Sequence, residues 1–134
     1  MRQEAAAHDQ SWMLSDVADV PGVQHAVVLS ADGLVRARTD DLGADDADTL
    51  AAAAAGLQSL GSSLAGRFGE GAPKQHMIEW KGGFLFLRGA GDGSRLAVIT
   101  SNRVDPGVIA SQMVLQVQRF GDHQATPPRR QSIP

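Results

Sequence analysis

The sequence predicts an α/β (α+β) fold in which a five-stranded, mostly antiparallel sheet lies between helices, with the element order α-β-β-α-β-β-β-α. Three observations lead to this prediction. Residues 23–38 form a Val-rich run, an Asp-Gly turn and a second extended run. Residues 46–68 form one long Ala-rich segment with helical spacing of apolar positions, and residues 75–100 form three short apolar runs separated by Gly-rich turns.

Each element has its own start and stop signals. A short helix is expected at 8–19, because Leu14 and Val17 have helical spacing and Pro21-Gly22 stops the pattern. Gly33 permits the positive φ of a tight hairpin between 23–29 and 34–38. The remaining elements are the long helix 46–68, the strands 75–81, 84–88 and 95–100, and a final helix at 106–120 introduced by Asp105-Pro106.

Burial patterns place the strands within the sheet. Continuous apolar runs are typical of strands that helices cover on both faces, whereas runs that mix polar and apolar residues suit sheet edges. The strands 23–29, 84–88 and 95–100 are continuous, and 34–38 and 75–81 are mixed. Numbered along the chain, the strands therefore have the order 2-1-5-4-3, with the long helix on one face and the two terminal helices on the other.

Length and composition fit one domain. Of the 134 residues, 1–10 are expected to be a flexible N-terminus, 11–121 the domain and 122–134 a disordered tail. The net charge of −3 and the lack of a basic stripe give no sign of nucleic-acid binding. No apolar run is long enough to insert into a membrane, and the N-terminus has no signal-peptide pattern, so a cytoplasmic location is expected.

No motif indicates catalysis, a cofactor or a metal. The sequence has no Cys, and its four His residues lie at unrelated positions without a ligand spacing. The loop 89–93 is Gly-rich but lacks the Gly-Lys-Ser/Thr ending of a phosphate loop. The acidic run 40–48 does not match an EF-hand and suits the start of a helix instead. We therefore expect a non-enzymatic protein with no cofactor.

The long helix predicts self-association. One stripe of larger apolar residues, including Leu50, Leu57, Leu64 and Phe68, is expected to pack on the sheet. A second stripe consists of the small residues Ala52, Gly56, Ser59 and Ser63. Gly inside a helix costs up to about 1 kcal/mol relative to Ala, and the close approach of a second copy of the helix would compensate for it. Biased codon usage that enriches Ala is the alternative explanation.

The mixed edge strand 75–81 has little to prevent it from pairing with another strand. The predicted homodimer interface therefore combines the small-residue stripe with residues of this edge, namely His76, Ile78 and Trp80.

The order of elements and these residues resemble the roadblock/dynein light chain family. The resemblance is carried by GVQHAVVLSADGLVRAR at 22–38, the Ala/Gly/Ser-rich helix 46–68, and HMIEW with its GG turn and FLFL. It covers about 11–121 and implies the profilin/longin-like roadblock fold. It also implies a homodimer in which the long helices pack together and the third strands join the two sheets.

The resemblance further implies a partner. The chain is similar to short roadblock proteins of actinobacterial operons that also encode a sensor histidine kinase and a small Ras-like GTPase. Bacterial members of the MglB type act as GTPase-activating partners, which implies that this dimer binds such a GTPase and regulates its nucleotide cycle. Polar residues flanking the paired helices, Gln58, Arg67 and Glu70, are the candidate partner face. A GTPase-independent scaffold and a PAS- or GAF-like small-molecule sensor remain alternatives.

Overall fold

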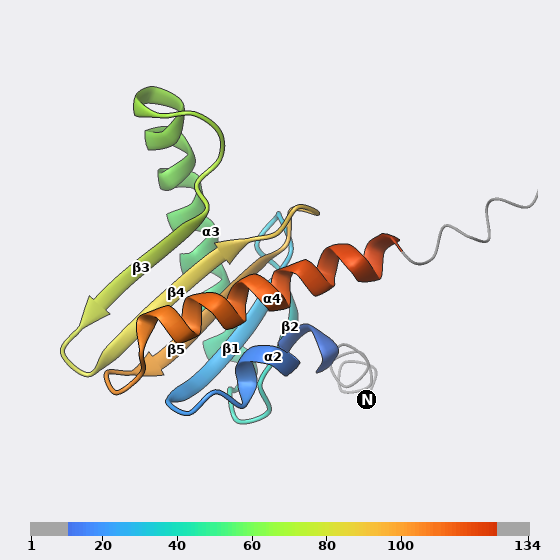
Figure 1. Ribbon diagram of the computed structural model, residues 1–134, viewed down its shortest axis with the longest axis vertical. Coiled ribbons are helices and arrows are strands. Elements are labelled where there is room, and N and C mark those ends of the chain that lie inside the picture. The colour runs from blue at the N-terminus through green and yellow to red at the C-terminus, as the bar shows by residue number, and fades with distance from the viewer. Residues whose placement is uncertain (1–10, 126–134) are drawn as a thin grey trace, which may run out of the picture.

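The computed structural model describes residues 11–125, so the predicted flexible N-terminus and the end of the tail lie outside the described residues. A five-stranded sheet forms its centre, and the strand order β2-β1-β5-β4-β3 confirms the sequence prediction (Figure 1). Every pair of neighbouring strands is antiparallel. The strands are β1 (Val23–Leu29), β2 (Val35–Arg38), β3 (Gln75–Trp80), β4 (Gly83–Gly89) and β5 (Arg95–Ser101).

Helices cover both faces of this sheet. The long helix α3 (Ala44–Phe68) lies behind the sheet in Figure 1. The 3-10 turn η1 (Ser11–Leu14), the short helix α2 (Ser15–Ala18) and the final helix α4 (Pro106–Ala125) lie on the opposite face. The predicted layers are therefore correct.

The three central strands supply two separate cores, because successive side chains of a strand point to opposite faces. On β4, Phe84 and Phe86 pack with Ile109 and Met113 in the core beneath α4. Leu85 and Leu87 pack in the core beneath α3. This double coverage explains why the sequence of β4 is apolar without alternation.

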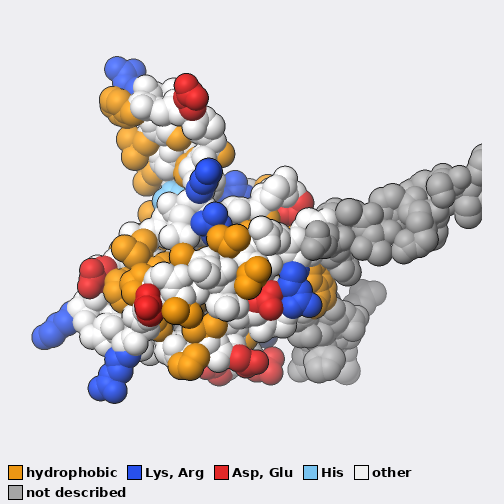
Figure 2. Space-filling model, in the orientation of Figure 1, with side chains coloured by type: hydrophobic (Ala, Val, Ile, Leu, Met, Phe, Trp, Pro, Cys, Tyr) orange, Lys and Arg blue, Asp and Glu red, His pale blue; other side chains and the backbone are white. Residues whose placement is uncertain are grey.

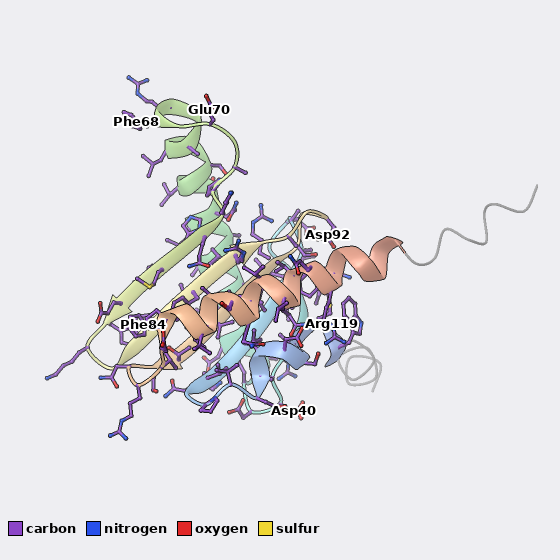
Figure 3. The ribbon with its side chains drawn as sticks, viewed as in Figure 1. Asp40, Phe68, Glu70, Phe84, Asp92 and Arg119 are labelled. Atoms are coloured by element: carbon purple, nitrogen blue, oxygen red, sulfur yellow. The ribbon has the colours of Figure 1, made fainter. Side chains whose placement is uncertain are left out.

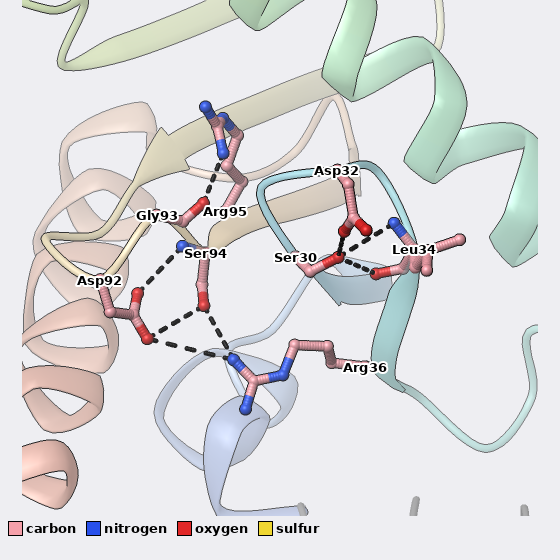
Figure 4. A network of polar contacts seen from close by, with 8 residues as sticks. All are labelled: Ser30, Asp32, Leu34, Arg36, Asp92, Gly93, Ser94 and Arg95. Carbon is pink, nitrogen blue, oxygen red and sulfur yellow. Dashed lines mark hydrogen bonds and ion pairs between the residues drawn. The ribbon is translucent and has the colours of Figure 1, made fainter.

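Two similar hairpin loops lie side by side at one end of the sheet (Figure 4). In the β1–β2 loop, Gly33 has a φ of 87° and its N–H donates to the Ser30 carbonyl at 2.9 Å. In the β4–β5 loop, Gly93 has a φ of 91° and donates to the Ala90 carbonyl at 3.1 Å. In each turn an Asp precedes a residue with left-handed backbone conformation, namely Gly33 or Gly93. Glycine adopts this conformation without strain, which explains its presence at both positions.

The N-terminal segment differs from its prediction as one helix over 8–19. The described part consists of η1 followed by the four-residue α2, and the Ser15 hydroxyl donates to the Trp12 carbonyl at 3.0 Å. Such a local side-chain bond competes with continuous helix formation. Buried Gln116 of α4 holds the segment in place, since it accepts from the Asp16 N–H at 2.5 Å and donates to the Trp12 carbonyl at 2.8 Å.

The final helix is longer than predicted. It continues to Ala125 instead of ending at residue 120, and residues 122–125 of the expected tail therefore belong to it. The first strong stop signal is Thr126-Pro127, because proline disfavours a helical conformation in the residue before it.

The long helix also extends beyond the sheet. Its 25 residues span about 37 Å at 1.5 Å per residue. A seven-residue strand such as β4 spans only about 23 Å at 3.3 Å per residue. The C-terminal part of α3, residues 59–68, contains no fully buried residue and projects as an arm (Figure 1).

Candidate protein-interaction surface

The arm, residues 59–68, exposes three large apolar side chains. Leu60, Leu64 and Phe68 are 65%, 61% and 79% exposed. The sequence predicted that this stripe packs on the sheet along its whole length, and for the arm that prediction is wrong. The reason is the length mismatch, since the sheet ends beneath the start of the arm, where Gly61 packs against His76 of β3. The packed face instead consists of Ala47, Ala51, Ala54 and Gln58, all in the first part of α3.

Figure 2 shows hydrophobic side chains gathered on the projecting part of the molecule. Exposed apolar residues that occur singly are common, but a contiguous set on one element marks an interaction site or a site of aggregation. The arm is therefore the first component of a candidate interaction surface.

The small-residue stripe forms a second component. Ala52, Gly56, Ser59 and Ser63 are all exposed. A Cβ atom added to Gly56 would meet no atom within 4 Å, so packing within the described chain does not require glycine there. Among the described residues, no close contact of Gly56 offsets its low helix propensity.

Gly61 has a different role. A Cβ atom at this position would collide with the His76 imidazole, which packs across from β3. Gly61 is therefore explained within one chain, and His76 is half-buried beside it with neither ring nitrogen hydrogen-bonded to a described residue.

Strand β3 is the third component, and it lies at the sheet edge as predicted. His76, Ile78 and Trp80 point to the face that α3 occupies, because they pair with Leu87, Leu85 and Gly83. Ile78 and Trp80 are 39% and 44% exposed. The outer side of β3 has no neighbouring strand among the described residues, so its backbone groups are open to pairing.

The candidate partner face is only partly at the surface. Arg67 and Glu70 are exposed at the tip of the arm, and Figure 3 shows Glu70 and Phe68 together there. The Arg67 guanidinium lies 5.9 Å from the centre of the Phe68 ring. Gln58, however, is only 7% exposed, so its predicted place on an exposed flank is wrong. It follows Ala54 by four residues and therefore lies on the buried face of α3.

Other polar residues considered in the sequence have structural contacts. Arg36 donates to the Ser94 hydroxyl at 2.9 Å, and Arg38 donates to the Leu42 carbonyl. His25 lies 3.5 Å from Asp41, and Asp45 is in the first turn of α3. The described residues include no group of three or more His, Cys, Asp or Glu side chains placed to hold a metal ion. None of the described helices is both long and apolar enough to cross a membrane.

The chain is therefore an α/β domain with a candidate surface for protein interaction. This surface consists of the arm, the small-residue stripe and the open edge strand β3. The family model for the Roadblock/LC7 domain matches residues 10–100, and the chain belongs to this family.

The chain is also similar to several solved structures. A Roadblock/LC7 domain from Streptomyces avermitilis is 38% identical, with a TM-score of 0.79, and the match covers 87% of this chain and 97% of that one. MglB from Myxococcus xanthus has a TM-score of 0.73 at 18% identity, over 85% of this chain and 89% of that one. Profilin IB from Acanthamoeba castellanii has a TM-score of 0.60 at 11% identity, over 81% and 95% of the two chains, and shares the fold alone. No curated protein matches the sequence.

Proposed function

We propose that the protein is a non-catalytic, cytoplasmic homodimeric adaptor that binds a small Ras-like GTPase and regulates its nucleotide cycle. The observation that carries the proposal is the exposed apolar arm at the end of the helix that bears the small-residue stripe, together with the open edge of β3. Membership of the Roadblock/LC7 family supports the adaptor role. The resemblance that implies a GTPase also implies a sensor histidine kinase in the same signalling system.

A second copy of the chain is the best candidate to cover the arm. Twofold symmetry brings the same surface of both copies together, so one copy's small-residue stripe can meet the other's. Covering a large apolar side chain contributes about 1.5–3 kcal/mol, and each copy exposes three on its arm, Leu60, Leu64 and Phe68. Pairing of the two β3 edges would satisfy their open backbone groups in the same assembly.

The GTPase would bind a surface that both copies build. The switch loops of Ras-like GTPases are ordered only when the γ-phosphate is present, and a regulator must distinguish the two states to bias them. The exposed Arg67 and Glu70 place both signs of charge next to Phe68 at the end of each arm. Such polar groups around an apolar centre suit a protein partner.

The test is the affinity of the protein for the Ras-like GTPase of its own operon, loaded with GDP or with a non-hydrolysable GTP analogue. We expect a clear preference for one nucleotide state, and we expect deletion of 123–134 to leave the affinity unchanged. Equal affinity for both states would reduce the protein to a scaffold. No binding in either state would contradict the proposal.

A GTPase-independent scaffold is the second candidate function, because it would have the same fold and the same interaction surface as the GTPase-binding adaptor.

A PAS- or GAF-like sensor needs an open sheet face as its pocket. Here α3 packs on the apolar residues of β1, β4 and β5 on that face, which favours the adaptor.

A further inference from the structure

A cavity of about 390 Å³ lies where the loop after the arm meets the β4–β5 hairpin. Its volume is at the lower end of the range for small-molecule sites, roughly 300–1,000 Å³. Three separate segments build it, so no single motif in the sequence reveals it. Its walls are formed by Gln58, Ala72, Pro73, Lys74, Arg88, Gly89, Ala90, Gly93, Ser94 and Arg95.

The cavity is positively charged. Lys74, Arg88 and Arg95 line it, and none of the described residues in its wall is acidic. Figure 2 shows a group of Lys and Arg side chains near the base of the projecting arm. The nearby Asp92 carboxylate accepts from the Ser94 N–H at 2.9 Å and lies 4.0 Å from Arg36.

Figure 4 shows Asp92 turned toward Arg36, whereas the Arg95 guanidinium points away from that group. The Asp92 carboxylate therefore faces Arg36 and not the Arg95 guanidinium. Three cations without an acidic residue in the same wall attract an anion.

Two buried polar atoms of the wall have no hydrogen-bond partner among the described residues. One is Gln58 Oε1, an acceptor on a side chain that is only 7% exposed. The other is Arg95 Nε, a donor. Buried polar groups are nearly always satisfied, so an unpaired acceptor and an unpaired donor in one cavity point to a ligand that supplies both complements.

We propose that this cavity binds a small phosphate ester that carries a hydroxyl group. The phosphate, with its three acceptor oxygens and a charge between about −1.5 and −2, meets Lys74, Arg88 and Arg95. The hydroxyl donates to Gln58 Oε1. The wall contains no aromatic residue on which a base could stack, so the site suits a compact ester rather than a nucleotide. This site is additional to the GTPase surface and does not depend on it.

Amide chemical shifts of the full chain provide the test, with inorganic phosphate, glycerol 3-phosphate and glycerol as probes at constant ionic strength. We expect saturable shifts at Ala72, Lys74 and 89–95 with both phosphates and none with glycerol. Glycerol 3-phosphate should bind about two- to tenfold more tightly than inorganic phosphate, because it adds one neutral hydrogen bond.

Substitutions of the cavity residues test which side chains bind the phosphate and the hydroxyl. Arg95→Gln should weaken both phosphates about tenfold or more, since it removes a charge-assisted bond. Lys74→Gln should also weaken both, and because Lys74 is exposed this variant does not disturb the core. Gln58→Leu should remove only the preference for glycerol 3-phosphate. The control Arg103→Gln, an exposed arginine outside the cavity, should bind like wild type.

Shifts that rise linearly without saturation would overturn the proposal. Equal affinities of Arg95→Gln, Lys74→Gln and Arg103→Gln would overturn it too. If Gln58→Leu keeps the full preference for glycerol 3-phosphate, the assignment of the hydroxyl to Gln58 is wrong.

Discussion

Replacing Gly56 by leucine separates association from folding. No atom lies within 4 Å of a Cβ at Gly56, and the residue is exposed on α3. Leucine has a better helix propensity than glycine, by somewhat less than the roughly 0.8–1 kcal/mol that separates alanine from glycine, so the isolated chain should be at least as stable as wild type. In the proposed dimer the same side chain would hold two helices apart.

The size of the effect follows from symmetry. Overpacking costs about 1–3 kcal/mol for each inserted side chain, and a twofold interface receives the substitution twice. The dimer should therefore lose about 2–6 kcal/mol, which corresponds to at least roughly 30-fold weaker association.

Light scattering after size exclusion, over a series of concentrations, measures this loss. Wild type should elute with twice the chain mass of 14.1 kDa, and Gly56→Leu should shift toward the monomer. Gly121→Leu is the matched control, because Gly121 is also an exposed, uncrowded glycine but lies on α4. A Gly56→Leu dimer as tight as wild type would refute the argument from the small-residue stripe, and a monomeric wild type at tens of micromolar would refute the dimer.

Further predictions concern stability, the arm and nucleotides. Gly61→Ala should destabilise the chain in urea unfolding by up to about 2 kcal/mol, because an overpacking cost of about 1–3 kcal/mol against His76 exceeds a helix-propensity gain of about 1 kcal/mol, and adding His76→Ala should restore stability; no loss would mean that the imidazole moves aside. Gln116→Leu should cost about 1–3 kcal/mol in the same assay, since it leaves the Asp16 N–H without its acceptor and removes one donor from the Trp12 carbonyl, and an unchanged midpoint would contradict this role. Phe68→Ser should weaken the dimer without lowering the stability of the monomer, whereas Leu115→Ser on α4 should leave association unchanged; equal effects of the two would remove the arm from the interface. Calorimetry should show no micromolar binding of GTP to the isolated protein, and such binding would contradict the proposal that the protein is a non-catalytic adaptor.

The strand order was predictable because the relevant signals are local. The continuous run Phe84–Leu87 required two covered faces, and the glycine turn before it required antiparallel neighbours. Gly33 fixed the first hairpin through its positive φ. None of these inferences depended on distances between remote segments.

The arm and the cavity were not predicted, for two different reasons. Helical periodicity identifies an apolar stripe but not what covers it, and Leu64 looks the same whether sheet or solvent lies beneath it. Comparison of helix and strand lengths could have revealed the arm. The spacing of Gln58 after Ala54 could have revealed its burial. The meeting of Lys74 with Arg95 depends on tertiary structure, and no sequence signal reports it.

The central claim is that the GTPase-binding surface requires both copies of the chain. The affinity of Gly56→Leu for the Ras-like GTPase proposed as its partner, in the nucleotide state that wild type prefers, tests it most directly. The substitution should abolish binding together with dimerisation, while Gly121→Leu binds like wild type. A monomeric Gly56→Leu protein that binds the GTPase with wild-type affinity would contradict the claim.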